Sequence, residues 1–243
     1  MINPGSFLAI ALALVHGFAT KLPIFHLIPR FRWTSFAGGV SLSYVFLDIF
    51  PELSHAQEEL QHSETLVLKY LENHVYILAL VGVLLFYGLN LLALKINFTE
   101  LSNQEFKNHN YLVFWLHISV FAVLNMIISY LLQDLSEHSI IQCILFFITF
   151  ALHLFIVDEH LREHQQHLYD KFGRWFLVGA IIFGAIIGQG MHLDEATIAI
   201  IWSFLSGIII FNVLNKELPK ETKTCFTSFL SGSLLFSLLL LSI

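Results

Sequence analysis

Eight apolar stretches of about 20 residues each run through this chain and leave few choices of fold. A helix that rises 1.5 Å per residue needs roughly 20 apolar residues to cross about 30 Å of hydrocarbon. The stretches cover residues 5–26, 34–53, 75–95, 111–132, 139–157, 173–191, 196–214 and 224–243. None of them shows the alternation that is typical of a barrel strand. We therefore predict an all-α integral membrane protein with eight transmembrane helices.

The composition supports a lipid environment. Apolar residues make up 56% of the 243 residues and charged residues 12%, whereas soluble domains carry about 25% charged residues. The longest connection, residues 54–74, is too short for a soluble domain, so residues 1–243 are expected to form a single polytopic membrane domain. We expect a multi-pass protein of the cell membrane, with the lipid bilayer as its surroundings and no nucleic-acid partner. A homodimer stays open.

Two smaller features fit the same interpretation. The first apolar stretch lacks a basic leader and a small-residue cleavage site, so we expect it to be retained rather than cleaved as a signal peptide. Cys143 and Cys225 fall inside predicted spans, which favours small buried apolar residues over a disulfide.

The basic residues predict the orientation of the chain. Eleven of the twelve Lys and Arg residues lie in the odd-numbered connections, and only Lys69 lies in an even-numbered one. Basic residues stay on the cytoplasmic side because their translocation is disfavoured. Both termini are therefore expected on the non-cytoplasmic side.

Two segments resemble each other at an offset of 168 residues. Ser35, Gly39 and Pro51 correspond to Ser203, Gly207 and Pro219, with apolar residues between them. In the predicted orientation the two segments cross the membrane in opposite directions, which is typical of an inverted-repeat transporter. The interpretation is a 3+2+3 bundle, in which the first three spans pair with the last three. A chance likeness between two apolar helices that begin with small residues is the alternative.

Ionisable and polar side chains inside the spans are candidates for function because their burial in hydrocarbon is costly. They are His16, Asp48, His117 with Asn125, and His153 with Asp158. Imidazole pairs of this kind suit either hydrogen bonding between helices or metal ligation.

A histidine face follows the fifth span. If the helix continues, His153, His160, His164 and His167 share one side at steps of 7, 4 and 3 residues. His160 and His164, one turn apart, could chelate a divalent transition metal. The alternative is a solvated extension of the helix.

Three of the spans carry short motifs of small residues and proline. The second span reads Phe36-Ala-Gly-Gly and ends Asp48-Ile-Phe-Pro-Glu. The seventh reads Phe204-Leu-Ser-Gly and closes on Glu217-Leu-Pro, and the eighth contains Phe229-Leu-Ser-Gly-Ser. These motifs, in eight spans of 3+2+3 order with outside termini, resemble the ZIP (Zrt/Irt-like) divalent-metal transporters. The chain resembles a divergent member, because its metal motif in helices 4 and 5 is degenerate.

The resemblance implies a metal site between the fourth and fifth spans. His117 and His153 match the leading histidines of the family's two motifs, while Phe121 and Val157 stand where further ligands are expected. Zinc usually takes four ligands. Asp158, Asp48 or His16 would complete the set, with His160 and His164 receiving the ion.

The leading hypothesis is a carrier of a divalent transition-metal cation, zinc or iron(II), which is the transported ion rather than a cofactor. Imidazole donors with few carboxylates favour such ions over magnesium or calcium. One alternative is a transporter of another substrate, or a proton-coupled carrier that uses a His/Asp relay. Another is a ZIP-like membrane protein that does not transport. No serine nucleophile motif is present, and Asp48 and Asp158 are expected near opposite membrane faces, so no enzyme is expected.

Overall fold

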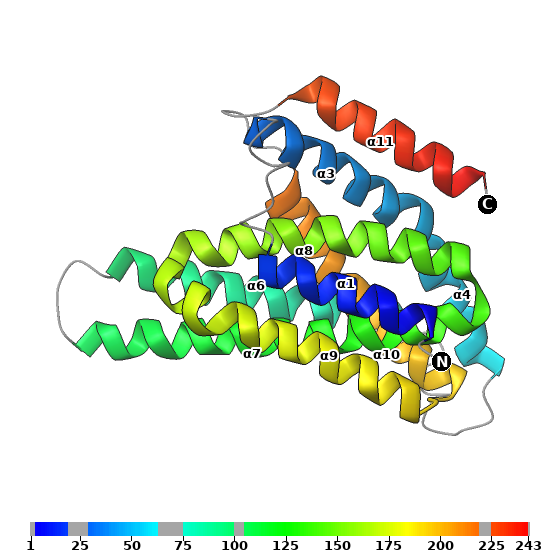
Figure 1. Cartoon of the computed structure of the whole chain (residues 1–243), viewed down its shortest axis with the longest axis horizontal. Helices are drawn as coiled ribbons and strands as arrows, with labels where there is room; N and C mark the ends of the chain where they lie inside the picture. The colour runs from blue at the N-terminus through cyan, green and yellow to red at the C-terminus, as the bar shows by residue number, and fades with distance from the viewer. Residues whose placement is uncertain (1–2, 19–28, 63–74, 100–104, 219–224, 243) are drawn as a thin grey trace. The chain divides into compact units, whose positions relative to one another are not determined.

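The computed structural model describes residues 3–18, 29–62, 75–99, 105–218 and 225–242, and every regular element in them is helical. Figure 1 shows the helices in chain order. Their bounds are α1 Pro4–Phe18, α3 Arg30–Tyr44, α4 Phe50–His62, α6 Val75–Thr99, α7 Glu105–His138, α8 Ile140–Leu168, α9 Arg174–Gly190, α10 Glu195–Asn212 and α11 Phe226–Leu241. Three π-helical turns, η2 Val45–Ile49, η3 Tyr169–Gly173 and η4 Val213–Glu217, continue α3, α8 and α10.

Within the described ranges, six helices are long and apolar enough to cross a membrane. They are Phe31–Glu58, Val75–Leu92, Tyr111–His138, Ile140–Asp158, Gln166–Gly190 and Glu195–Asn215. The first and last expected spans appear as shorter apolar helices, Pro4–Phe18 and Phe226–Leu241. The all-helical fold and the multi-pass membrane class are therefore confirmed by the length and composition of the helices.

Several helix ends differ from the predicted spans. The second helix does not stop near residue 53 but continues through α4 to His62, into what the hydropathy pattern assigns to a connection. α8 runs 29 residues to Leu168, which confirms the helical extension after the fifth span. Hydropathy reports where lipid begins and not where a helix ends, so polar turns beyond an apolar stretch escape it. Cys225 precedes α11 as its N-cap, and both cysteines are free.

The chain divides into two compact units, residues 1–19 with 85–192 and residues 20–84 with 193–243. The first unit contains α1, α7, α8 and α9, and the second contains α3, α4, α10 and α11. The division falls within α6.

In the first unit, α1 packs against α7, α8 and α9, and α7 packs against α8 and α9. Asn3 starts α1: its side chain accepts from the Gly5 amide at 3.4 Å, and Pro4 occupies the first helical position, where its missing N–H costs nothing. A Cβ on Gly184 would collide with the Met126 backbone. This close approach brings α9 against α7.

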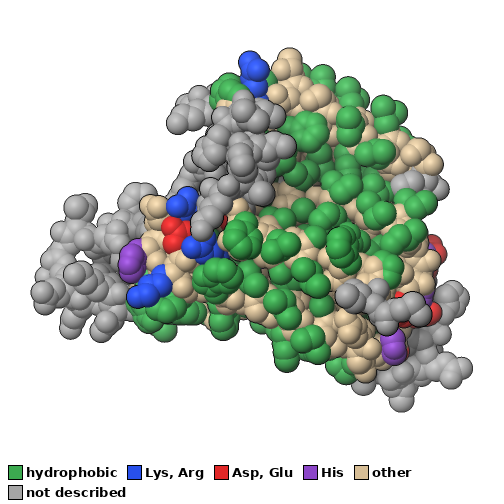
Figure 2. Space-filling view, in the orientation of Figure 1, with side chains coloured by type: hydrophobic (Ala, Val, Ile, Leu, Met, Phe, Trp, Pro, Cys, Tyr) green, Lys and Arg blue, Asp and Glu red, His purple; other side chains and the backbone are tan. Residues whose placement is uncertain are grey.

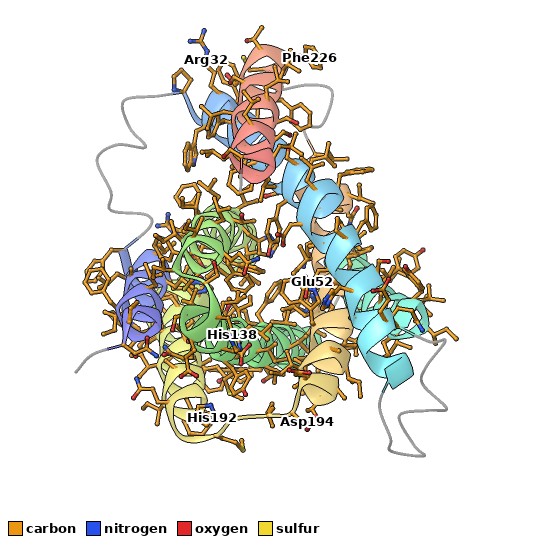
Figure 3. The ribbon with its side chains drawn as sticks, turned by 90° about the vertical axis from the view of Figure 1, so that its right-hand side faces the viewer. Arg32, Glu52, His138, His192, Asp194 and Phe226 are labelled. Carbon is orange, nitrogen blue, oxygen red and sulfur yellow. The ribbon has the colours of Figure 1, made fainter. Side chains whose placement is uncertain are left out.

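In the second unit, α3 and α11 lie side by side and run in the same direction (Figures 1 and 3). Arg32 and Phe226 mark the starts of the two helices in Figure 3. The Cys225 amide donates to Ser35 at 3.1 Å, and farther along the Ser43 and Ser233 hydroxyls are 2.8 Å apart.

Apolar side chains cover much of the molecular surface. Figure 2 shows them spread over the visible face, with few charged or histidine side chains among them. Phe7, Leu112 and Leu238 are each more than 60% exposed. Exposed apolar side chains are more favourably placed in contact with lipid tails than in contact with water.

Candidate functional site

Four buried polar side chains from distant parts of the chain meet inside the first unit. His16 Nδ1 lies 2.5 Å from Asp158 Oδ1, and His16 Nε2 lies 2.9 Å from Asn125 Nδ2. The Tyr169 hydroxyl donates to the same Asp158 Oδ1. His16 is 3% exposed and the other three are 1% exposed. We call these four residues the His16–Asp158 centre.

Each member of the centre comes from a different element. His16 lies in the last turn of α1, Asn125 in the middle of α7 and Asp158 in the middle of α8. Tyr169 opens η3, directly after α8. The π turn places a tyrosine eleven residues beyond Asp158 next to its carboxylate.

An ion pair between Arg162 and Asp170 spans the turn that places Tyr169 beside Asp158. Arg162 Nε lies 3.1 Å and 3.2 Å from the two carboxylate oxygens of Asp170, and Nη2 lies 3.2 Å from Oδ2. These side chains are about one-third exposed, so solvent screens the pair and its contribution is below about 1 kcal/mol. Its two-pronged geometry holds Tyr169 in register more than it stabilises the fold.

The contacts of His16 fit one tautomer of the neutral ring. The Asn125 amide nitrogen can only donate, so His16 Nε2 accepts and the remaining imidazole proton sits on Nδ1, facing Asp158. A doubly protonated His16 would instead need an acceptor at Nε2. The Asn125 side chain would supply one if its amide turned over, because Oδ1 would then face the ring.

Two oxygens of the centre have no hydrogen-bond partner among the described residues, Asp158 Oδ2 and Asn125 Oδ1. A buried acceptor without a partner costs about 1–3 kcal/mol, and more when it is charged. Asp158 therefore concentrates two donors on one oxygen and leaves the other bare. The bare oxygen is where a positively charged species would be held.

The other candidates from the sequence have described contacts of their own or have side chains outside the described residues. His117 is half-buried, and its Nδ1 lies 3.0 Å from the Val113 carbonyl of its own helix. His153 is buried with its ring edge-on to Phe150, at 6.0 Å between centroids. His160 and His164 lie in α8, but their side chains are outside the described residues.

Asp48 belongs to the second unit, where it lies in η2 and hydrogen-bonds the Tyr44 side chain. Tyr44 is fully buried beside Phe236 of α11, at 6.5 Å between ring centroids. Asp48 is thus a polar group of the second unit, near the contact between α3 and α11, and is not a member of the His16–Asp158 centre.

Among the described residues, no three His, Cys, Asp or Glu side chains gather closely enough to hold a metal ion. The centre contributes one imidazole and one carboxylate, and its amide oxygen is a third, weaker donor. Zinc usually takes four ligands. These residues by themselves are therefore a partial ligand set.

Tyr169 is the member of the centre that sequence reasoning missed. It follows the polar stretch after the fifth span, so it reads as an interfacial aromatic residue. His16 and Asp158 are both identified as intramembrane groups, but nothing in the sequence pairs them across 142 residues. The helical continuation of α8 is the one local signal that leads from Asp158 towards Tyr169.

The fold and the centre define a multi-pass helical membrane protein with a buried ionisable pair. Comparisons with protein-family models, with curated proteins and with solved structures find no match to this chain.

Proposed function

We propose that this chain is a ZIP-like membrane carrier of divalent transition-metal cations, and that the cation binds at the His16–Asp158 centre. The observation that carries the proposal is the carboxylate of Asp158, which is buried in a helix bundle and has one oxygen without a hydrogen-bond partner among the described residues. Ionisable side chains at such depth are costly and mark ion pathways in membrane proteins. Burial of a carboxylate beside a neutral imidazole is costly rather than stabilising, so a role in function accounts for it better.

The donors of the centre suit the proposed cargo. Imidazole nitrogen with carboxylate oxygen is a ligand combination for zinc and iron(II). Metal ligands must be deprotonated, so metal binding competes with protons. A metal bound at Nδ1 would displace the proton that His16 now directs at Asp158.

The remaining residues complete the proposed path. His117 and His153 would lie along the route of the ion, and the His160/His164 face would receive it. In this proposal the bundle is a 3+2+3 inverted repeat with both termini on the non-cytoplasmic side. Asp48 lies in the second unit and would be a separate candidate ligand there.

A proton-coupled carrier of another substrate is the second candidate, and the single negative charge that Asp158 supplies favours it. One carboxylate balances one positive charge, which matches a single proton, while a divalent ion would leave one charge uncompensated in the bundle. The alternative orientation of the Asn125 amide would accommodate that proton on His16.

Reconstitution in sealed liposomes separates the two candidates. The vesicles would enclose a metal-sensitive dye in one set and a pH-sensitive dye in another, with zinc or iron(II) added outside. Asp158→Asn keeps the side-chain size and removes the charge, so it should abolish metal entry. Asp194→Asn is the matched control, because Asp194 is exposed at the N-cap of α10 in the second unit, and asparagine serves as an N-cap equally well.

The outcomes are distinct. Metal entry that requires Asp158 but not Asp194 supports the metal carrier, and single His117→Ala and His153→Ala variants then test the path. Proton flux that requires Asp158, without metal entry, supports the second candidate. If Asp158→Asn folds and transports like the parent, the centre is not the site. If the parent moves neither ion, the non-transporting alternative is favoured.

A further inference from the structure

A line of polar side chains runs along α7 away from the His16–Asp158 centre. It begins at Asn125 and continues through Ser129 and Gln133 to Ser136, at steps of 4, 4 and 3 residues. Residues at this spacing share one face of a helix. Asn125, Ser129 and Gln133 are each at most 1% exposed. We call this line the α7 polar stripe.

Three successive members of the stripe carry a buried polar atom without a hydrogen-bond partner in the described structure. They are Asn125 Oδ1, Ser129 Oγ and Gln133 Nε2. Each such atom costs about 1–3 kcal/mol, and native proteins contain few of them. One helical turn, about 6 Å of rise, separates each from the next. Three on one face therefore indicate a continuous polar feature rather than isolated packing faults.

The far end of the stripe reaches the ends of three helices. Ser6 Oγ donates to Gln133 Oε1 at 3.2 Å and accepts from Gln189 Nε2 at 2.6 Å. Ser136 Oγ donates to Asn3 Oδ1 at 2.9 Å. Asn3 precedes α1, and Gln189 lies next to the last residue of α9. The stripe thus spans about 16 Å, from the centre to the end of the bundle.

Helix α1, which packs against α7, contributes no buried polar side chain along this length. Between Ser6 and His16, the buried residues of α1 are Ala9, Leu12 and Ala13. Of these two helices, α7 therefore supplies the buried polar side chains between the two ends. All of them are neutral groups that can donate or accept hydrogen bonds, and none carries the charge that a stationary metal ion would need.

We propose that the α7 polar stripe is a hydrated path by which protons pass between the His16–Asp158 centre and the end of the bundle at Asn3. Buried polar atoms at this spacing provide the partners that ordered water needs. Water held by Ser129 and Gln133 carries a proton along the line. The last water protonates His16 Nε2, and the Asn125 side chain turns so that its Oδ1 accepts from the protonated ring. This inference rests on the proposed function, because it gives the centre its access to one side of the membrane.

Two substitutions test the path while leaving the centre intact. Ser129→Ala and Gln133→Leu each remove a stripe group. Loss of one hydrogen-bond partner worth about 1 kcal/mol should slow proton exchange about fivefold in the liposome pH assay. Ser203→Ala is the matched control, because Ser203 is equally buried but bonds the Ala199 carbonyl of its own helix. Its rate should equal that of the parent.

A labelling experiment gives an independent answer without transport. In a background with Cys143→Ala and Cys225→Ser, Ser129→Cys should react with a small water-soluble methanethiosulfonate at least tenfold faster than Ser203→Cys. Equal, slow labelling of the two positions overturns the hydrated path. So does proton exchange in Ser129→Ala and Gln133→Leu at the rate of the Ser203→Ala control.

The two proposals fail differently. If Asp158→Asn stops ion movement while the stripe variants behave like the control, the path is wrong and the proposed function stands. If Asp158→Asn has no effect on ion movement, the proposed function fails. Fast labelling of Ser129→Cys would then still establish a hydrated path in the bundle.

Discussion

Replacing Tyr169 with phenylalanine removes one hydroxyl group from the His16–Asp158 centre and keeps the buried ring. The hydroxyl donates to Asp158 Oδ1, and a hydrogen bond to a charged acceptor contributes about 1.5–3 kcal/mol. Asp158 Oδ2 already lacks a partner in the described structure, so the carboxylate would keep only the bond from His16. The free energy of unfolding should fall by about 1.5–3 kcal/mol, which raises the unfolding equilibrium constant about 10- to 150-fold.

The measurement is an SDS titration in mixed micelles, followed by tryptophan fluorescence and circular dichroism. Tyr111→Phe is the control, because Tyr111 is half-exposed on α7, and a surface change of this kind stays within about 0.5 kcal/mol. A double-mutant cycle with Asp158→Asn should show a coupling of about 0.5–3 kcal/mol. Equal stabilities of the Tyr169→Phe and Tyr111→Phe variants, or additive effects in the cycle, would refute the assigned contact.

Two further predictions concern helix packing and helix capping. Gly39→Ala would drive a Cβ into the Phe229 carbonyl of α11, which should destabilise the fold by about 1–3 kcal/mol; Gly179→Ala, with open space around it, should be neutral or stabilising in the same titration. The Thr197 hydroxyl donates to the Asp194 N-cap at 2.7 Å and lowers the pKa of that carboxyl group. The stabilisation of α10 by Asp194 is therefore complete above the ordinary aspartate pKa and is lost as the pH falls through the lowered pKa. Thr197→Val should raise the Asp194 pKa in an NMR titration, and an unchanged pKa would contradict the capping geometry.

The hydropathy of the sequence is sufficient to predict the helices of this fold. Each apolar stretch predicts its own helix, because a backbone in lipid must satisfy its hydrogen bonds locally. The burial of His153 and Asp158 also follows, since both lie in or beside such a stretch. The end of α4 at His62 did not follow, because that last part of the helix is polar and carries no lipid signal.

The grouping of the ionisable residues was decided only by the tertiary structure. The sequence places His16 in the first span and Asp158 at the foot of the fifth, but contacts across 142 residues depend on which helices pack together. The pattern on α7 pointed to His117, whereas the buried partner of His16 is Asn125, two turns farther on. Tyr169 lies at the centre because it begins a π turn. Such a turn contains one extra residue, and no sequence periodicity in this chain predicts it.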